Sequence, residues 1–141
     1  MSIEHNVITE TDLHEPKGIS TAAANAIHVA DGAGSGTWKI VFTSSDTTIT
    51  SGFANYEVSH GLGFTPKIYT AYIRNTTAEF GYSIGDKIDV GCFSSGMSLY
   101  ASSTKLGLTT FATFLISRKD NGTTVTMTPA NWVLVFQALP F

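Results

Sequence analysis

The residues that could carry out chemistry are few in this chain and lie far apart in its sequence. His14 and Glu15 are adjacent, but a zinc-binding helix needs a second histidine four residues away. Asp86 and Asp89 are too isolated to predict the two carboxylates that flank a glycosidase cleft. Cys92 is the only cysteine, which excludes an intrachain disulfide and a site built from several thiolates. We therefore predict no catalytic residues, no metal site and no cofactor.

One glycine-rich motif and the histidines have simpler structural interpretations. His60-Gly61-Leu62-Gly63 lacks the spacing of a phosphate-binding loop, and no Lys-Ser or Lys-Thr follows it. We interpret it as a loop that ends a strand, in which Gly61 or Gly63 takes a positive φ. The histidines are His5, His14, His28 and His60. Three copies of one of them could meet on a trimer axis and bind a metal or an anion, but hydrogen bonding in turns is the simpler role.

The composition limits the kind of protein. The net charge of −3 argues against a nucleic-acid binder, which would carry a basic face. Only 13% of the residues are charged, which argues against a disordered region. The first residues do not form a basic region followed by an apolar one, and no apolar run approaches the length of a membrane span. We expect no nucleic acid, no membrane insertion and no signal peptide.

Short segments rich in Val, Ile, Thr and aromatic residues alternate with turn signals from Trp38 onwards. The predicted strands are Trp38–Phe42, Thr47–Ile49, Phe53–Val58, Pro66–Arg74, Ile88–Phe93, Met97–Ala101, Thr109–Ser117, Thr123–Met127 and Asn131–Leu139. Phe80–Lys87 is expected to hold a turn at Gly85-Asp86. Asn121-Gly122 is typical of a type I′ hairpin. The last strand is apolar on both faces, so it should be central or covered by a neighbouring subunit. This pattern predicts an all-β fold, an antiparallel β-sandwich or jelly roll.

The N-terminal region lacks the sustained strand pattern that follows Trp38 and is interrupted by glycines. Residues 1–38 are predicted to form an extended arm, and residues 39–141 to form the sandwich. Within the arm we expect a short helix over Ser20–Ala26, followed by a strand over Ala26–Ala30. Ordering each residue costs about 1–2 kcal/mol of backbone entropy. A glycine-broken arm gains little from ordering alone, so we expect sister chains to stabilise it.

Two blocks of the arm carry a family resemblance. Leu13-His14-Glu15-Pro16-Lys17-Gly18, followed by Val29-Ala30-Asp31-Gly32-Ala33-Gly34-Ser35-Gly36, resembles an N-terminal module of tailed-bacteriophage virion proteins. The match covers residues 3–38. It implies a small tail-fibre, head-fibre, spike or decoration protein on the particle surface, made in the host cytoplasm. Its implied partners are two further copies of itself and other phage virion proteins of the capsid or tail.

This resemblance gives the arm its candidate residues. The residues proposed for attachment and oligomerisation are Leu13, His14, Glu15, Pro16, Lys17, Gly18 and Trp38. A rigid turn around Pro16, with a local contact between Glu15 and Lys17 or a contact between subunits, is the simplest interpretation of this block.

The sandwich carries a looser resemblance. Val58–Lys67, Gly81–Asp86 and Trp132–Gln137 look like parts of the small β-sandwiches at phage fibre tips, which are similar to trimeric H-type lectin folds. A receptor-binding module for host surface glycan is therefore the alternative function. A polysaccharide-degrading enzyme is a third alternative and would need carboxylates that converge in a groove.

Loop polarity and the aromatic residues suggest where a receptor would bind. Two polar, tip-like loops give the receptor-binding candidates Asn75, Thr76, Thr77, Glu79, Ser94 and Ser95. Six aromatic residues could stack on sugar rings, although their alternating strand positions favour the core or a subunit interface. They are Tyr56, Tyr69, Tyr72, Tyr82, Tyr100 and Trp132.

Overall fold

A computed structural model describes residues 22–24, 26–30, 36–92, 96–112 and 114–141 of the chain. The chain falls into two units, Met1–Ile40 and Val41–Phe141. Among the described residues, no helix combines the length and the apolar character that crossing a bilayer requires.

The described part of the first unit is an antiparallel hairpin. Strand β1 (Ala26–Ala30) pairs with β2 (Gly36–Ile40), so that Ala26 lies opposite Ile40 and Ala30 opposite Gly36. The predicted strand over Ala26–Ala30 is confirmed. The predicted helix over Ser20–Ala26 is wrong where it is described, because residues 22–24 are not helical and Ala26 already belongs to β1. A helix of two turns is marginal even with good propensity, and pairing in the hairpin overrides it.

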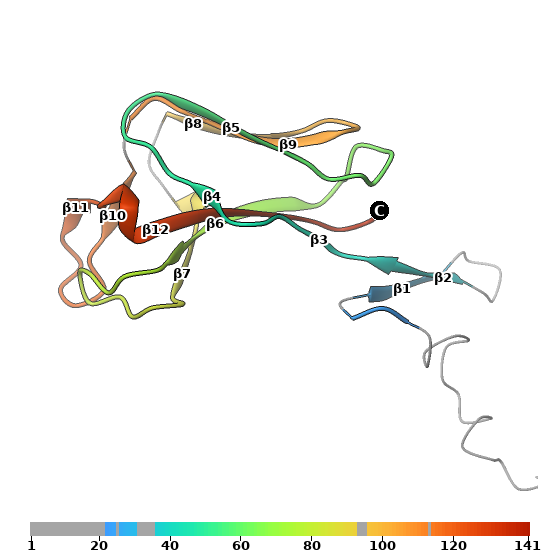
Figure 1. The fold of residues 1–141 in the computed structure, drawn as a ribbon, viewed down its shortest axis with the longest axis horizontal. Helices are drawn as coiled ribbons and strands as arrows, with labels where there is room; N and C mark the ends of the chain where they lie inside the picture. Colours follow the sequence, from blue (N-terminus) through green and yellow to red (C-terminus); the bar gives the residue numbers. More distant parts are fainter. Residues whose placement is uncertain (1–21, 25, 31–35, 93–95, 113) are drawn as a thin grey trace, which may run out of the picture. The chain divides into compact units, whose positions relative to one another are not determined.

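The second unit is a β-sandwich of two antiparallel sheets, which confirms the predicted all-β class. The first sheet contains β3 (Phe42–Thr43), β4 (Thr47–Thr48), β6 (Tyr69–Asn75), β7 (Lys87–Asp89) and β12 (Trp132–Ala138). Its order is β3-β12-β6-β7, and β4 also pairs with β12. The second sheet contains β5 (Ala54–Ser59), β8 (Met97–Ala101) and β9 (Lys105–Thr110), in the order β5-β9-β8. Figure 1 shows it lying over the sheet that contains β6 and β12.

The core lies between these two sheets. Leu134 and Phe136 of β12 and Ile73 of β6 are completely buried, and they are met by Leu106 and Leu108 of β9. Strand β12 pairs with β6 on one side and with β3 and β4 on the other, so it is central, as its two apolar faces predicted.

A separate small hairpin joins β10 (Leu115–Ser117) to β11 (Thr124–Thr126). The hairpin is confirmed, but its predicted type I′ turn is wrong. That turn needs positive φ at both Asn121 and Gly122, and only Gly122 has one, at 74°. The loop is longer, because Arg118 N donates to Thr123 O and Gly122 N donates to Arg118 O. The Asn121 side chain accepts the N–H of Thr123 instead.

Three strand predictions differ from the structure. The first, Trp38–Phe42, is not one strand, because β2 ends at Ile40 and β3 begins at Phe42. The predicted strand Thr109–Ser117 is two strands, because β9 begins at Lys105 and the chain bends after Thr110. The turn expected at Gly85-Asp86 is confirmed, with a positive φ at Gly85 and a hydrogen bond from Asp86 N to Ser83 O. Ile88–Phe93 is a strand only to Asp89, and the 3₁₀ helix η2 (Val90–Cys92) follows. A second 3₁₀ helix, η3 (Pro129–Asn131), leads into β12. Local apolar content predicted a strand in each case, whereas the turns depend on contacts distant in sequence.

Candidate binding site

The described receptor-binding candidates lie near Asn131 and Trp132, where they make contacts within the fold. Asn75 is completely buried at the end of β6, opposite Trp132, and so it is not a surface residue as predicted. Thr76 is half-buried and Thr77 is exposed, and the backbone N–H of each donates to Asn131 O. Ser94 and Ser95 lie outside the described residues.

Glu79 has a structural environment rather than that of a ligand contact. Its carboxylate accepts hydrogen bonds from Trp132 Nε1, from Asn131 Nδ2 at 2.9 Å and from Thr128 N at 3.1 Å. Burial opposes ionisation of Glu79, but these hydrogen bonds outweigh it and lower the pKa of the carboxyl. Glu79 therefore connects its loop to η3 and to the start of β12. That Glu79 recognises a receptor stays a prediction.

Two loops are fastened together at the same end of the sandwich. Lys119 Nζ lies 2.7 Å from Asp86 Oδ2, and Tyr82 Oη donates to Ser117 O at 2.6 Å. The Lys119 ammonium lowers the pKa of Asp86, and a hydrogen bond from Ser83 N adds to this effect. These contacts join the loop after β6 to the β10–β11 hairpin.

The His60-Gly61-Leu62-Gly63 segment is a loop that ends β5, as predicted. Gly61 and Gly63 both have positive φ, at 64° and 79°. His60 is only 6% exposed, its Nδ1 accepts the N–H of Leu62 at 3.1 Å, and its Nε2 donates to Ser102 O at 3.0 Å. Because both ring nitrogens are used inside the fold, His60 holds two loops together.

The predicted attachment residues are mostly beyond what the structure describes. Leu13, His14, Glu15, Pro16, Lys17 and Gly18 lie outside the described residues. Trp38 lies in β2 opposite His28, and their rings meet edge to face with centroids 5.2 Å apart. In the described ranges, no three His, Cys, Asp or Glu side chains come together as metal ligands.

The structure sorts the six aromatic candidates. Tyr56 and Trp132 are buried in the core. Tyr69 and Tyr82 pack against that core, with the Tyr82 ring edge on to Trp132. The remaining two, Tyr72 and Tyr100, lie at strand positions whose side chains face away from the core. Lys87 Nζ lies 4.6 Å from the centroid of the Tyr72 ring, which leaves Tyr100 as the candidate platform.

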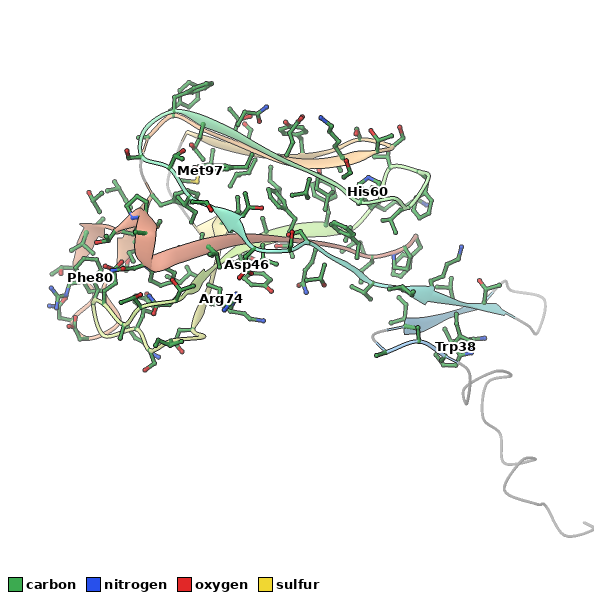
Figure 2. All side chains as sticks on the ribbon, viewed as in Figure 1. Trp38, Asp46, His60, Arg74, Phe80 and Met97 are labelled. Carbon is green, nitrogen blue, oxygen red and sulfur yellow. The ribbon has the colours of Figure 1, made fainter. Side chains whose placement is uncertain are left out.

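Tyr100 crosses the outer face of the β5-β9-β8 sheet. It lies opposite Gly107 of β9, which in turn lies opposite Glu57 of β5. A Cβ on Gly107 would be 2.2 Å from Tyr100 Cζ and 2.4 Å from its hydroxyl oxygen. The tyrosine ring therefore occupies the space that any larger residue at 107 would fill. Figure 2 shows side chains projecting from this face, on the side away from β12.

Polar groups from three strands surround the ring. The Tyr100 hydroxyl lies 2.9 Å from Asn55 Oδ1 and 2.9 Å from Glu57 Oε1, and Thr109 Oγ1 donates to Asn55 Oδ1 at 3.1 Å. Lys105 Nζ donates to Glu57 Oε2. The hydrogen bond from Lys105, followed by that from Tyr100, lowers the pKa of Glu57. Burial, followed by the bond to Glu57, raises the pKa of Tyr100. We call these five residues, with Gly107, the Tyr100 platform.

The sandwich also exposes large apolar side chains. Phe53 and Phe111 are 69% and 73% exposed, and their ring centroids lie 6.3 Å apart. An apolar hollow of about 240 Å³ lies between the ends of β6 and β12, where Val41, Ile68 and Leu139 are among its lining residues. Exposed apolar surface is typical of contact sites with other molecules where it forms large patches.

Sequence reasoning recognised Tyr100 as one aromatic residue among six but missed the platform. A glycine inside a strand pattern often marks the close approach of another group, and Gly107 was the available signal. Comparisons with family models, curated proteins and solved structures gave no match.

Proposed function

We propose that this chain is a structural virion protein of a tailed bacteriophage, of the fibre, spike or decoration type. In this proposal it forms a homotrimer on the particle surface and attaches to the particle through its N-terminal arm. The observation that carries the proposal is the contrast between the two units. The sandwich encloses a core of its own, whereas none of the described side chains of the first unit with an assigned burial is buried.

The β1–β2 hairpin has the character of an element that packs against other chains. An isolated two-stranded hairpin is at best marginally stable in water. One face of this hairpin carries His28, Trp38 and Ile40, and Ile40 is 58% exposed. A threefold assembly would bring three such faces together and bury the apolar rings and side chains. The exposed Phe53 and Phe111 of the sandwich are further apolar surface that assembly would cover.

The mass of the purified full-length chain tests this proposal. A homotrimer has a mass of about 45 kDa, which is three times the 15.0 kDa of one chain. We expect that mass in native mass spectrometry and in light scattering, and we expect antibodies against the chain to label intact particles. A mass of one chain at micromolar concentration would contradict the trimer, and unlabelled particles would contradict the virion assignment.

Glycan recognition is a second candidate function, and the Tyr100 platform favours it. An aromatic ring that lies on a sheet surface among hydroxyl, amide and carboxylate groups has the groups that protein sites use to bind sugars. This candidate is compatible with the first, because a trimer would present three platforms to a surface rich in repeated sugars.

A further inference from the structure

We propose that the Tyr100 platform is a binding site for one neutral pyranose ring of a glycan. The inference rests on the second candidate function, glycan recognition, and names its site and ligand class. It places the receptor contact away from the predicted loop of Asn75 and Glu79, in which Asn75 is buried and Glu79 accepts a hydrogen bond from Trp132 Nε1.

The Tyr100 ring lies across the sheet and is held there by contacts with β9 and β5. Tyr100 reaches from β8 across β9, and its hydroxyl meets side chains of β5. Gly107 lies directly beneath the ring and gives it room to lie down on the sheet. Two hydrogen-bond acceptors, Asn55 Oδ1 and Glu57 Oε1, fix the hydroxyl end. The platform is therefore held in place before any ligand arrives, which reduces the entropy that binding must overcome.

The polar groups around the ring can form hydrogen bonds with the hydroxyls of a sugar. Pyranose rings have an apolar side of C–H groups and a rim of hydroxyls that both donate and accept. Ser98 lies opposite Thr109 of the platform in the register of β8 and β9. In the described part of the chain, Asn55 Nδ2 and the Ser98 hydroxyl make no hydrogen bond, so both can donate to a ligand. The second outward-facing tyrosine, Tyr72, offers no comparable stacking surface, because the Lys87 ammonium lies over its ring.

The charge of the platform selects a neutral ligand. Glu57 and Lys105 are the charged residues of the platform, and they pair with each other. An acidic sugar would meet Glu57, and a cationic one would meet Lys105, so either would have to compete with the existing ion pair. An uncharged ring can stack on Tyr100 and leave the pair intact.

The experiment uses the full-length protein and three probes. These are methyl β-D-galactopyranoside, methyl β-D-glucopyranoside and methyl α-D-mannopyranoside, each titrated to 20 mM while aromatic ¹H–¹³C NMR signals are recorded. We expect at least one probe to shift the Tyr100 ring signals with a dissociation constant of about 1–10 mM, as befits a single ring with few contacts. Three probes that all leave these signals unmoved would overturn the proposal.

Four variants separate the platform from the rest of the molecule. Because Tyr100→Ala has no ring signal to follow, binding by all four variants is measured on the ¹H signals of the probe by saturation transfer. Tyr100→Ala is expected to weaken binding at least tenfold, while Tyr100→Phe keeps the ring and should weaken it by no more than about threefold. Gly107→Ala leaves Tyr100 and its partners Asn55 and Glu57 in the chain but places a methyl group where the ring lies. We therefore expect this variant to bind the probe at least tenfold more weakly. Tyr72→Ala, on the other sheet, is the matched control and should bind normally.

The outcomes distinguish this site from the proposed assembly. Thermal unfolding of each variant shows whether it folds, and Gly107→Ala tests the platform even if Tyr100→Ala does not fold. Binding that survives in a folded Tyr100→Ala or Gly107→Ala variant would place the sugar elsewhere and refute the proposal. The mass of the same samples is measured in parallel. A trimer that binds no sugar would contradict only the proposed sugar site, and a monomer that binds sugar would contradict only the proposed trimer.

Discussion

Removal of residues 1–40 is expected to convert a trimer into a folded monomer that no longer attaches to the particle. The remaining chain, Val41–Phe141, keeps both sheets and the whole core between them, whose buried residues run from Ile49 to Ala138. It should therefore unfold in one cooperative transition, as single domains of this size usually do. Light scattering should report one chain instead of three, and sedimentation with particles should fall to background.

Full-length protein purified in the same way is the control for this experiment. A gentler variant, Trp38→Ser with Ile40→Ser, removes apolar side chains from one face of the hairpin and leaves its backbone pairing in place. We expect it to dissociate at concentrations where the parent protein stays assembled. A truncated chain that remains trimeric would move the assembly contacts to the sandwich, and one that still attaches would move the docking site there.

Glu79→Ala is expected to lower the free energy of unfolding by about 2–4 kcal/mol. The substitution removes the acceptor for three donors at once, among them Trp132 Nε1, on a side chain that is 1% exposed. A buried donor without an acceptor costs about 1–3 kcal/mol by itself. Chemical denaturation with urea, followed by tryptophan fluorescence, measures the loss.

Glu57→Ala is the matched control for this substitution. Glu57 also accepts hydrogen bonds, from Tyr100 and Lys105, but it lies on the solvent-exposed face of the sheet. Exposed ion pairs contribute little to stability, so the change should be much smaller than at Glu79. Equal losses at the two positions would show that the Glu79 contacts do not stabilise the core.

The same carboxylate predicts how stability depends on pH. The folded pKa of Glu79 is lower than its ordinary value of 4.5. Its contribution is therefore fully present above the unfolded pKa and is lost as the pH falls through the folded value. Urea denaturation from pH 7 to pH 3 should show the difference between the parent protein and Glu79→Gln shrinking below pH 4.5. A difference that stays constant over this range would contradict the lowered pKa.

The fold class could be predicted from the sequence because strand patterns are local. Met97–Ala101 was predicted with its correct bounds, and the two apolar faces of the last strand predicted the central position of β12. Glycines in His60–Gly63 predicted the positive φ values of that loop. In each of these cases the side chains of a short segment suffice, because alternation and turn chemistry act between close neighbours in the chain.

The roles of individual polar residues could not be predicted in this way. The sequence predicted Asn75 and Glu79 as exposed loop residues. Asn75 is instead buried, and Glu79 accepts a hydrogen bond from Trp132, which lies 53 positions further along the chain. The Tyr100 platform likewise joins β5, β8 and β9 through residues 43 and 45 positions apart. The sequence by itself determined an antiparallel sandwich behind a distinct N-terminal region. Only the tertiary structure decided which polar and aromatic groups face each other, because pairing across strands, rather than distance along the chain, sets those contacts.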